Sequence, residues 1–147
     1  MCTRAFDGRG IRRWLVALMF LSLLGVGDSA YLLWKYQAGE SAFCPANGCD
    51  LVTRGEYAQL RGIPLAALGL GGYLTLLALS VMATALGGRS LVGMIFAVSG
   101  IGVSVSAFLV YLQVAVIKAV CVWCILSAFT VASIFVLSVL LVRKCGL

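Results

Sequence analysis

Four long apolar stretches constrain the fold of this chain more than any other feature. A single charged residue, Asp28, interrupts the stretches 14–34, 63–86, 90–117 and 119–142. About 20 apolar residues in helical conformation span the hydrocarbon core of a bilayer. The hydrophobic fraction of 63% and the charged fraction of 11% also lie far from those of soluble domains. We therefore predict an all-α membrane protein, a bundle of four transmembrane helices.

The short connections between these stretches indicate how the bundle is organised. The joints at 87–89 and around Lys118 leave room for antiparallel neighbours only, and the longest polar stretch is an outer loop at 36–62. The spans and their joints use nearly all 147 residues. We expect one domain over 1–147, no fused soluble redox domain, and any soluble partner in trans.

The first stretch has a second interpretation. A basic start that includes Arg12 and Arg13, an apolar run, and then Ser29 and Ala30 also describe a secretory signal peptide. Cleavage after Ala30 would put Asp28 where a small residue is needed, and the apolar pattern continues beyond it. A retained membrane anchor is the favoured interpretation.

The net charge of +6 carries information about orientation. Basic residues in short loops collect on the cytoplasmic side of a membrane, so the distribution does not point to a nucleic-acid partner. With the N-terminus inside, seven basic residues lie inside and four outside, which predicts cytoplasmic termini and an extracytoplasmic loop 36–62. The inner set is Arg4, Arg9, Arg12, Arg13, Arg89, Arg143 and Lys144, and the outer set is Lys35, Arg54, Arg61 and Lys118.

The outer loop has two predicted features. The turn-forming residues 45–48 separate Cys44 from Cys49, which favours a tight turn. Asp50 can then cap a short interfacial helix whose apolar residues reach Leu60, before Pro64 begins the second span.

Six cysteines separate into two groups by membrane side. Cys2 and Cys145 fall on the cytosolic side, where thiols stay reduced, and we interpret them as incidental free thiols or lipid attachment sites. The other four, Cys44, Cys49, Cys121 and Cys124, fall on the outer side.

Cys121 and Cys124 form a Cys-x-x-Cys motif at the start of the fourth span. This spacing puts both sulfur atoms on one face of a helix, and a helix start favours the thiolate, which is the attacking species. The motif alone also fits a static disulfide or two buried thiols.

A second pair on a loop over the same membrane face favours electron transfer between pairs. Exchange through a mixed disulfide needs one mobile pair, here Cys44 and Cys49, and one fixed pair, here Cys121 and Cys124. Three alternatives remain open: static disulfides, a four-thiolate zinc site, and a non-catalytic transporter subunit or assembly factor. We expect no metal.

The chain resembles the vitamin K epoxide reductase family from Asp28 to about Ala128. The resemblance rests on the Cys44…Cys49-Asp50-Leu51-Val52 stretch, Tyr57-Ala58, Gly62-Ile63-Pro64-Leu65-Ala66…Gly69, and Tyr111-Leu112 leading to Cys121-x-x-Cys124. It implies four helices around a quinone pocket, with menaquinone or ubiquinone as the electron acceptor. It also implies that Cys44 receives electrons from a thioredoxin-fold, DsbA-like partner, that Cys49 exchanges with Cys121, and that Cys124 faces the quinone.

The sequence also differs from the family at three places. The loop cysteines are closer together than in many members, Gly55 stands where relatives commonly have serine, and Ala128 replaces a tyrosine with which the vertebrate enzymes help hold vitamin K. The first two differences could alter the rate or the order of the loop. The third favours a bacterial-type enzyme of the inner membrane that oxidises a partner thiol and reduces a membrane quinone.

Four further residues are candidates for the quinone region. Asp28 lies inside the first span, where a carboxylate is either functional or part of a polar network. Lys118 could stabilise a thiolate or a reduced quinone, or simply reach the interface. Trp123 and Tyr111, with Tyr31, could wall a ring pocket or act as interfacial anchors.

Overall fold

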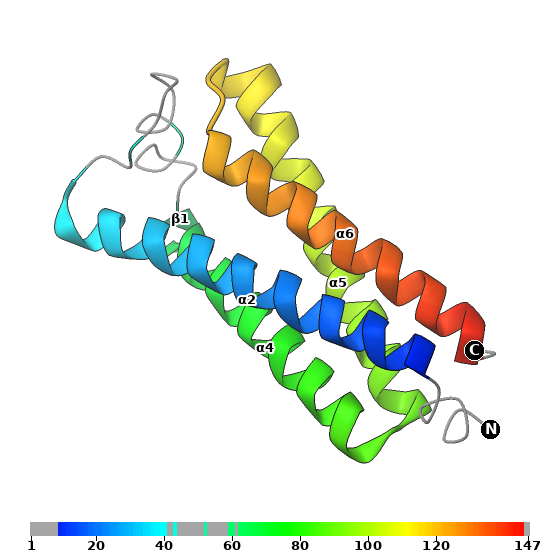
Figure 1. Ribbon diagram of the computed structural model, residues 1–147. Helices are drawn as coiled ribbons and strands as arrows, with labels where there is room; N and C mark the ends of the chain where they lie inside the picture. Colours follow the sequence, from blue (N-terminus) through cyan, green and yellow to red (C-terminus); the bar gives the residue numbers. More distant parts are fainter. Residues whose placement is uncertain (1–8, 41–42, 44–51, 53–58, 61, 146–147) are drawn as a thin grey trace.

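A computed structural model describes residues 9–40, 43, 52, 59–60 and 62–145. In this part of the chain, four helices are long and apolar enough to cross a membrane. They are built from α2 (Arg9–Ala38), α4 (Leu65–Leu86), α5 (Arg89–Tyr111) with its π-helical continuation η2 (Leu112–Ile117), and α6 (Val122–Cys145). The predicted bundle of four membrane helices is confirmed (Figure 1).

Each helix packs against two neighbours. Helix α2 packs on α4 and α6, and α5 packs on the same two helices, so α2 and α5 occupy opposite corners of the bundle. The start of α2 and the end of α6 lie at one end of the bundle, and the start of α6 lies at the other (Figure 1). The four helices therefore alternate in direction along the bundle, as the short joints predicted.

The observed helices differ slightly from the predicted spans. Helix α2 is longer than the stretch 14–34 because its flanking polar residues continue the helix at both ends. Pro64 does not begin α4 but caps it, with ψ 134°, so the helix starts at Leu65. The α4–α5 joint turns at Gly87, whose φ of 55° lies in the left-handed region that glycine adopts without strain.

The outer loop is described only in part. Strands β1 (Gln59–Leu60) and β2 (Ile63–Pro64) pair antiparallel around Gly62, whose φ is 85°. The predicted interfacial helix therefore does not extend to Leu60. The rest of that prediction lies outside the described residues, apart from Val52, which is helical.

The most tightly packed core lies in the half of the bundle near the chain ends. Leu18 of α2, Ile95 of α5 and Ile134 of α6 are almost completely buried there. Ser99 of α5 and Ser138 of α6 share a buried hydrogen bond at 3.2 Å. A polar contact between helices is well suited to a lipid environment, which offers no alternative partner.

Helices α2 and α4 approach each other especially closely in the other half of the bundle. A Cβ atom added at Gly25 of α2 would collide with the ring of Tyr73 on α4. The missing side chain thus lets the two helices approach with an aromatic ring between them. The Tyr73 hydroxyl group reaches across to α6, where it donates to the Ser127 carbonyl oxygen at 2.8 Å.

Candidate active site

Cys121 and Cys124 lie at the start of α6. The Cys121 carbonyl oxygen accepts the Ile125 N–H at 3.1 Å, which places Cys121 at the N-cap position. The Cys124 N–H donates to the Cys121 sulfur at 3.4 Å, so the sulfur takes the place of a capping side-chain oxygen. Both cysteines are free thiols. This geometry is that of a reduced Cys-x-x-Cys pair with its two side chains adjacent.

Cys121 is completely buried, yet its surroundings favour the thiolate. The Cys124 thiol, together with the backbone N–H groups of Cys124 and Trp123, hydrogen-bonds the sulfur and lowers the pKa of Cys121 from 9.0 to about 7, although burial opposes this. A thiolate both attacks disulfides and leaves from them more readily than a thiol. Cys121 is therefore the more reactive partner for exchange.

Gln113 supports this site and was not among the predicted residues. Its side-chain oxygen Oε1 accepts the Cys121 N–H at 3.1 Å, and the residue is only 3% exposed. It lies in η2, and Lys118, in the left-handed conformation with φ 51°, then turns the chain towards α6. The sequence carried one signal: Gln113 is the only carboxamide in the apolar stretch 90–117.

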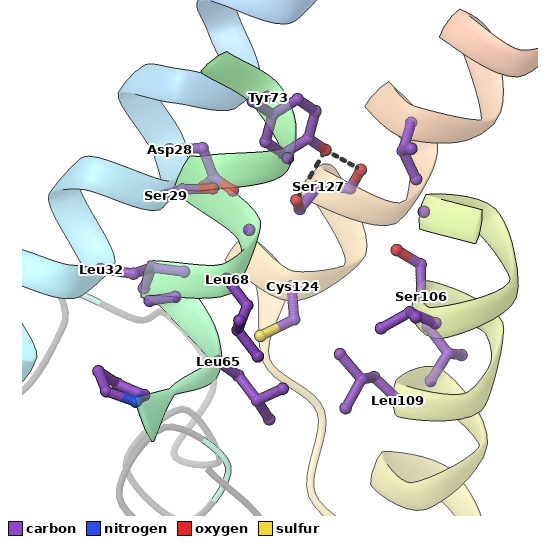
Figure 2. Close-up of a pocket in the computed structure, with 18 of the residues that line it drawn as sticks. Asp28, Ser29, Leu32, Leu65, Leu68, Tyr73, Ser106, Leu109, Cys124 and Ser127 are labelled. Carbon is purple, nitrogen blue, oxygen red and sulfur yellow. Dashed lines mark hydrogen bonds between the residues drawn. The ribbon is translucent and has the colours of Figure 1, made fainter. Parts of the chain in front are cut away.

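A cavity of about 500 Å³ opens beside Cys124. All four membrane helices contribute to its wall, and most of the lining side chains are apolar. Figure 2 shows the Cys124 side chain between Leu65 and Leu68 of α4 on one side and Leu109 of α5 on the other. The volume is in the range of small-molecule sites.

Asp28 is the charged residue in the cavity wall. Both of its carboxylate oxygen atoms are buried, and neither makes a hydrogen bond within the described part of the chain. The nearby Tyr73 hydroxyl group is engaged with Ser127, at 2.8 Å from its carbonyl oxygen and 2.9 Å from its hydroxyl oxygen (Figure 2). Asp28 thus has unused hydrogen-bonding capacity directed at an apolar cavity.

The other three quinone-region candidates do not line this cavity. Tyr111 is 63% exposed at the end of α5, and Lys118 is exposed in the turn. Trp123 instead stacks against Tyr31, with ring centroids 5.0 Å apart. The structure therefore brings together only Asp28, Cys121 and Cys124 from the predicted set that it describes.

Cys44 and Cys49, like Cys2 and Gly55, lie outside the described residues. Cys145 is not the free thiol that we expected, because it is disulfide-bonded. Among the residues that the structure describes, no group of three or more histidine, cysteine, aspartate or glutamate side chains could hold a metal ion.

Comparison with known proteins agrees with this site. The chain is 33% identical over 125 residues to the thiol-disulfide oxidoreductase LTO1 of Arabidopsis thaliana, an alignment that covers 76% of this chain. It spans about a third of the relative, 32% of its length. The model of the vitamin K epoxide reductase family matches residues 16–139. With four membrane helices and a Cys-x-x-Cys pair beside a cavity, the chain thus belongs to the vitamin K epoxide reductase family.

Proposed function

We propose that this protein is a membrane thiol–disulfide oxidoreductase that oxidises a thioredoxin-fold partner and reduces a membrane quinone. Electrons pass from the partner to Cys44 and Cys49, then to Cys121 and Cys124, and finally to the quinone. The reaction supports disulfide formation outside the cytoplasm. The name of the plant relative supports the thiol–disulfide part of this proposal.

The observation that carries the proposal is the unequal environment of the two helix-start cysteines. Cys121 is buried at the start of α6 and capped for thiolate formation, whereas Cys124 lines the cavity. One sulfur is suited to exchange with another disulfide, and the other faces a site for a small apolar molecule. A static disulfide needs neither feature.

The cavity fits a quinone. A quinone supplies a two-electron, two-proton acceptor when bound. The apolar side chains of α4 and α5 would hold its ring, and the unpartnered Asp28 carboxyl group could hydrogen-bond a ring oxygen and hold or release a proton there. A buried carboxyl group that makes no hydrogen bond within the described part of the chain is costly inside a membrane, which supports a ligand as its partner.

The loop cysteines can pass two electrons to Cys121 and Cys124 without any other reactant. The Cys49 thiolate attacks the Cys121 sulfur of the oxidised pair, the Cys121–Cys124 bond breaks, and a mixed disulfide forms. Cys44 then attacks Cys49, releases Cys121 as a thiolate and closes the loop disulfide. The loop pair has lost two electrons and the helix pair has gained them. Cys121 and Cys124 re-form their disulfide when they deliver two electrons and two protons to the acceptor.

Mass-tag trapping of thiols in cells tests the proposal. In the parent protein we expect a mixture of oxidised and reduced loop cysteines. Cys124→Ser should shift Cys44 and Cys49 towards the reduced state, because electrons can no longer leave for the acceptor. Ser133→Ala is the control, because Ser133 is exposed on the same helix nine residues beyond Cys124, roughly 13 Å away, and should leave the mixture unchanged.

A purified system provides the second test. The protein should oxidise a reduced DsbA-like partner continuously when quinone is present. Without quinone it should stop after about two partner molecules per protein, because each of the two cysteine pairs can accept two electrons once. If all four outer cysteines stay fully oxidised whatever the quinone supply, electron transfer is not their role. In that case the static-disulfide alternative would be correct.

A further inference from the structure

Phe43, the residue directly before Cys44, is held by its backbone. Its N–H donates to the Tyr31 hydroxyl oxygen at 3.2 Å, and its carbonyl oxygen accepts the Trp123 Nε1–H at 2.8 Å. Its side chain is 79% exposed, so burial does not hold it in place. Two hydrogen bonds from two different helices therefore fix the main chain at this point.

The two residues that hold Phe43 also contact each other. Tyr31 comes from α2 and Trp123 from α6, and their rings lie 5.0 Å apart with an interplanar angle of 43°. Such a tilted pair is a favourable aromatic contact that restrains both rings. We call Tyr31 and Trp123 the backbone clamp.

The sequence positions of the clamp give it a relation to the redox chemistry. Trp123 lies between Cys121 and Cys124, and Phe43 is covalently joined to Cys44. Neighbouring Cα atoms are 3.8 Å apart, so a fixed Phe43 limits where Cys44 can lie. Neither clamp residue lines the cavity beside Cys124.

Interfacial anchoring does not explain this arrangement. An aromatic anchor at a membrane surface turns its polar end to water or lipid headgroups. Here the polar ends of both side chains bind the same residue of a loop 80 positions away from Trp123 in sequence.

We infer that Tyr31 and Trp123 are positioning residues that hold Phe43, the residue through which the chain leads into the loop cysteines, beside the start of α6. They thereby set the rate at which Cys49 attacks the Cys121 sulfur. The inference rests on the proposed function, because it concerns the exchange step between the two pairs. It assigns no role to the clamp in quinone binding.

Two conservative variants test the clamp. Tyr31→Phe removes the hydroxyl acceptor, and Trp123→Phe removes the indole donor, while both keep an aromatic ring. Each should slow partner-driven turnover about fivefold, which corresponds to one ordinary hydrogen bond of about 1 kcal/mol. The KM for quinone should not change. Trp34→Phe is the control, because Trp34 is 65% exposed on the same helix as Tyr31 and should leave both quantities unchanged.

A protein without the loop cysteines shows whether the clamp variants act by positioning the loop or by a general effect on Cys121 and Cys124. In a Cys44→Ser/Cys49→Ser protein, a small dithiol must reduce Cys121 and Cys124 directly. Trp123→Phe and Tyr31→Phe should not slow quinone reduction in this background. Equal slowing in both backgrounds would overturn the inference, and so would full partner-driven turnover in both variants.

Failure of the proposed function would give a different result from failure of the clamp inference. If the parent protein shows no exchange between loop and helix pairs, the proposed electron path is wrong and the clamp has no such step to assist. If the parent exchanges and the two variants match it, the path stands and the clamp inference alone fails.

Discussion

At the scale of single residues, the position of Cys121 at a helix cap explains its reactivity. A sulfur that accepts the Cys124 N–H at 3.4 Å is stabilised as an anion in the same way as a capping carboxylate. Gln113 strengthens the arrangement because it engages the Cys121 N–H and fixes the turn before α6. The reactivity of Cys121 thus depends on two residues that lie close to it. Cys124 is also close in sequence, whereas Gln113 belongs to the preceding helix.

The thiolate of Cys121 should therefore form well below the usual pH. Because the pKa of Cys121 is lowered to about 7, the thiolate fraction should rise through that pH and be lost below it. Cys124→Ala should move the rise in thiolate to higher pH, since the Cys124 thiol makes the largest contribution to the lowered pKa of Cys121. Thiolate absorbance against pH, with Cys121→Ala as the blank, measures both. An unchanged midpoint in Cys124→Ala would contradict this origin of the shift.

Asp28 should show opposite effects on stability and activity. Asp28→Leu removes a buried carboxyl group that makes no hydrogen bond within the described residues, so the free energy of unfolding should increase by about 1–2 kcal/mol. The same change should raise the KM for quinone about tenfold, because the polar contact to the ring oxygen is lost. Thermal denaturation in detergent and steady-state kinetics measure the two effects.

Asp28→Asn separates hydrogen bonding from proton transfer. The amide keeps a donor in the cavity but cannot release a proton, so we expect a KM near that of the parent and a kcat lowered at least tenfold. A loss of stability in Asp28→Leu would instead identify Asp28 as part of a structural polar network.

At the scale of helices, close contacts at small residues set the shape of the half of the bundle that contains the cavity. Tyr73 lies over Gly25 and reaches Ser127, so one side chain joins α2, α4 and α6. The distortion at η2 and the left-handed turn at Lys118 then bring Gln113 beneath the start of α6. A straight helix with a flexible joint would not provide this support.

A methyl group at Gly25 should disturb this contact. Gly25→Ala would push the Tyr73 ring away, and overpacking of this kind lowers the free energy of unfolding by about 1–3 kcal/mol. Gly27→Ala is the matched control, because a Cβ atom there meets nothing within 4 Å. Thermal denaturation of both variants checks the prediction. Equal stability of the two would show that Tyr73 can move aside freely.

At the scale of the whole molecule, packing and function are divided between the two halves of the bundle. The buried core near the chain ends contains Leu18, Ile95 and Ile134, whereas the opposite half holds the cavity and the cysteine pair. The rigid half fixes the helix positions, and the open half can accept a ligand. This division follows from leaving small or polar residues where a packed core would otherwise form.

The distribution of basic residues predicts the orientation of the molecule. Arg89 and Arg143 lie at the same end of the bundle as the chain termini, and Lys118 lies at the other. In a protein whose loop cysteines are replaced by serine, Ala119→Cys should react with a membrane-impermeant maleimide in intact cells. Gly88→Cys should react only after permeabilisation. The reverse pattern would place the redox site in the cytoplasm.

Much of the architecture was predictable from the sequence. The four helices were predicted because an apolar stretch that spans a bilayer must satisfy its backbone groups internally. Cys121 and Cys124 were predicted as a pair because their spacing is local. The end of the interfacial helix and the state of Cys145 were not predicted. Leu60 instead pairs with Ile63 across the turn at Gly62, and the disulfide at Cys145 depends on a second cysteine.

The sequence by itself determined the fold class and the Cys-x-x-Cys pair at the start of the fourth helix, because hydropathy and short spacings act over one helix at a time. Only the tertiary structure decided that Asp28 and Cys124 share a cavity, and that Gln113 caps Cys121. It also decided that Trp123 and Tyr31 hold Phe43. Each of these contacts joins residues on different elements, and whether they meet depends on how the helices pack against one another.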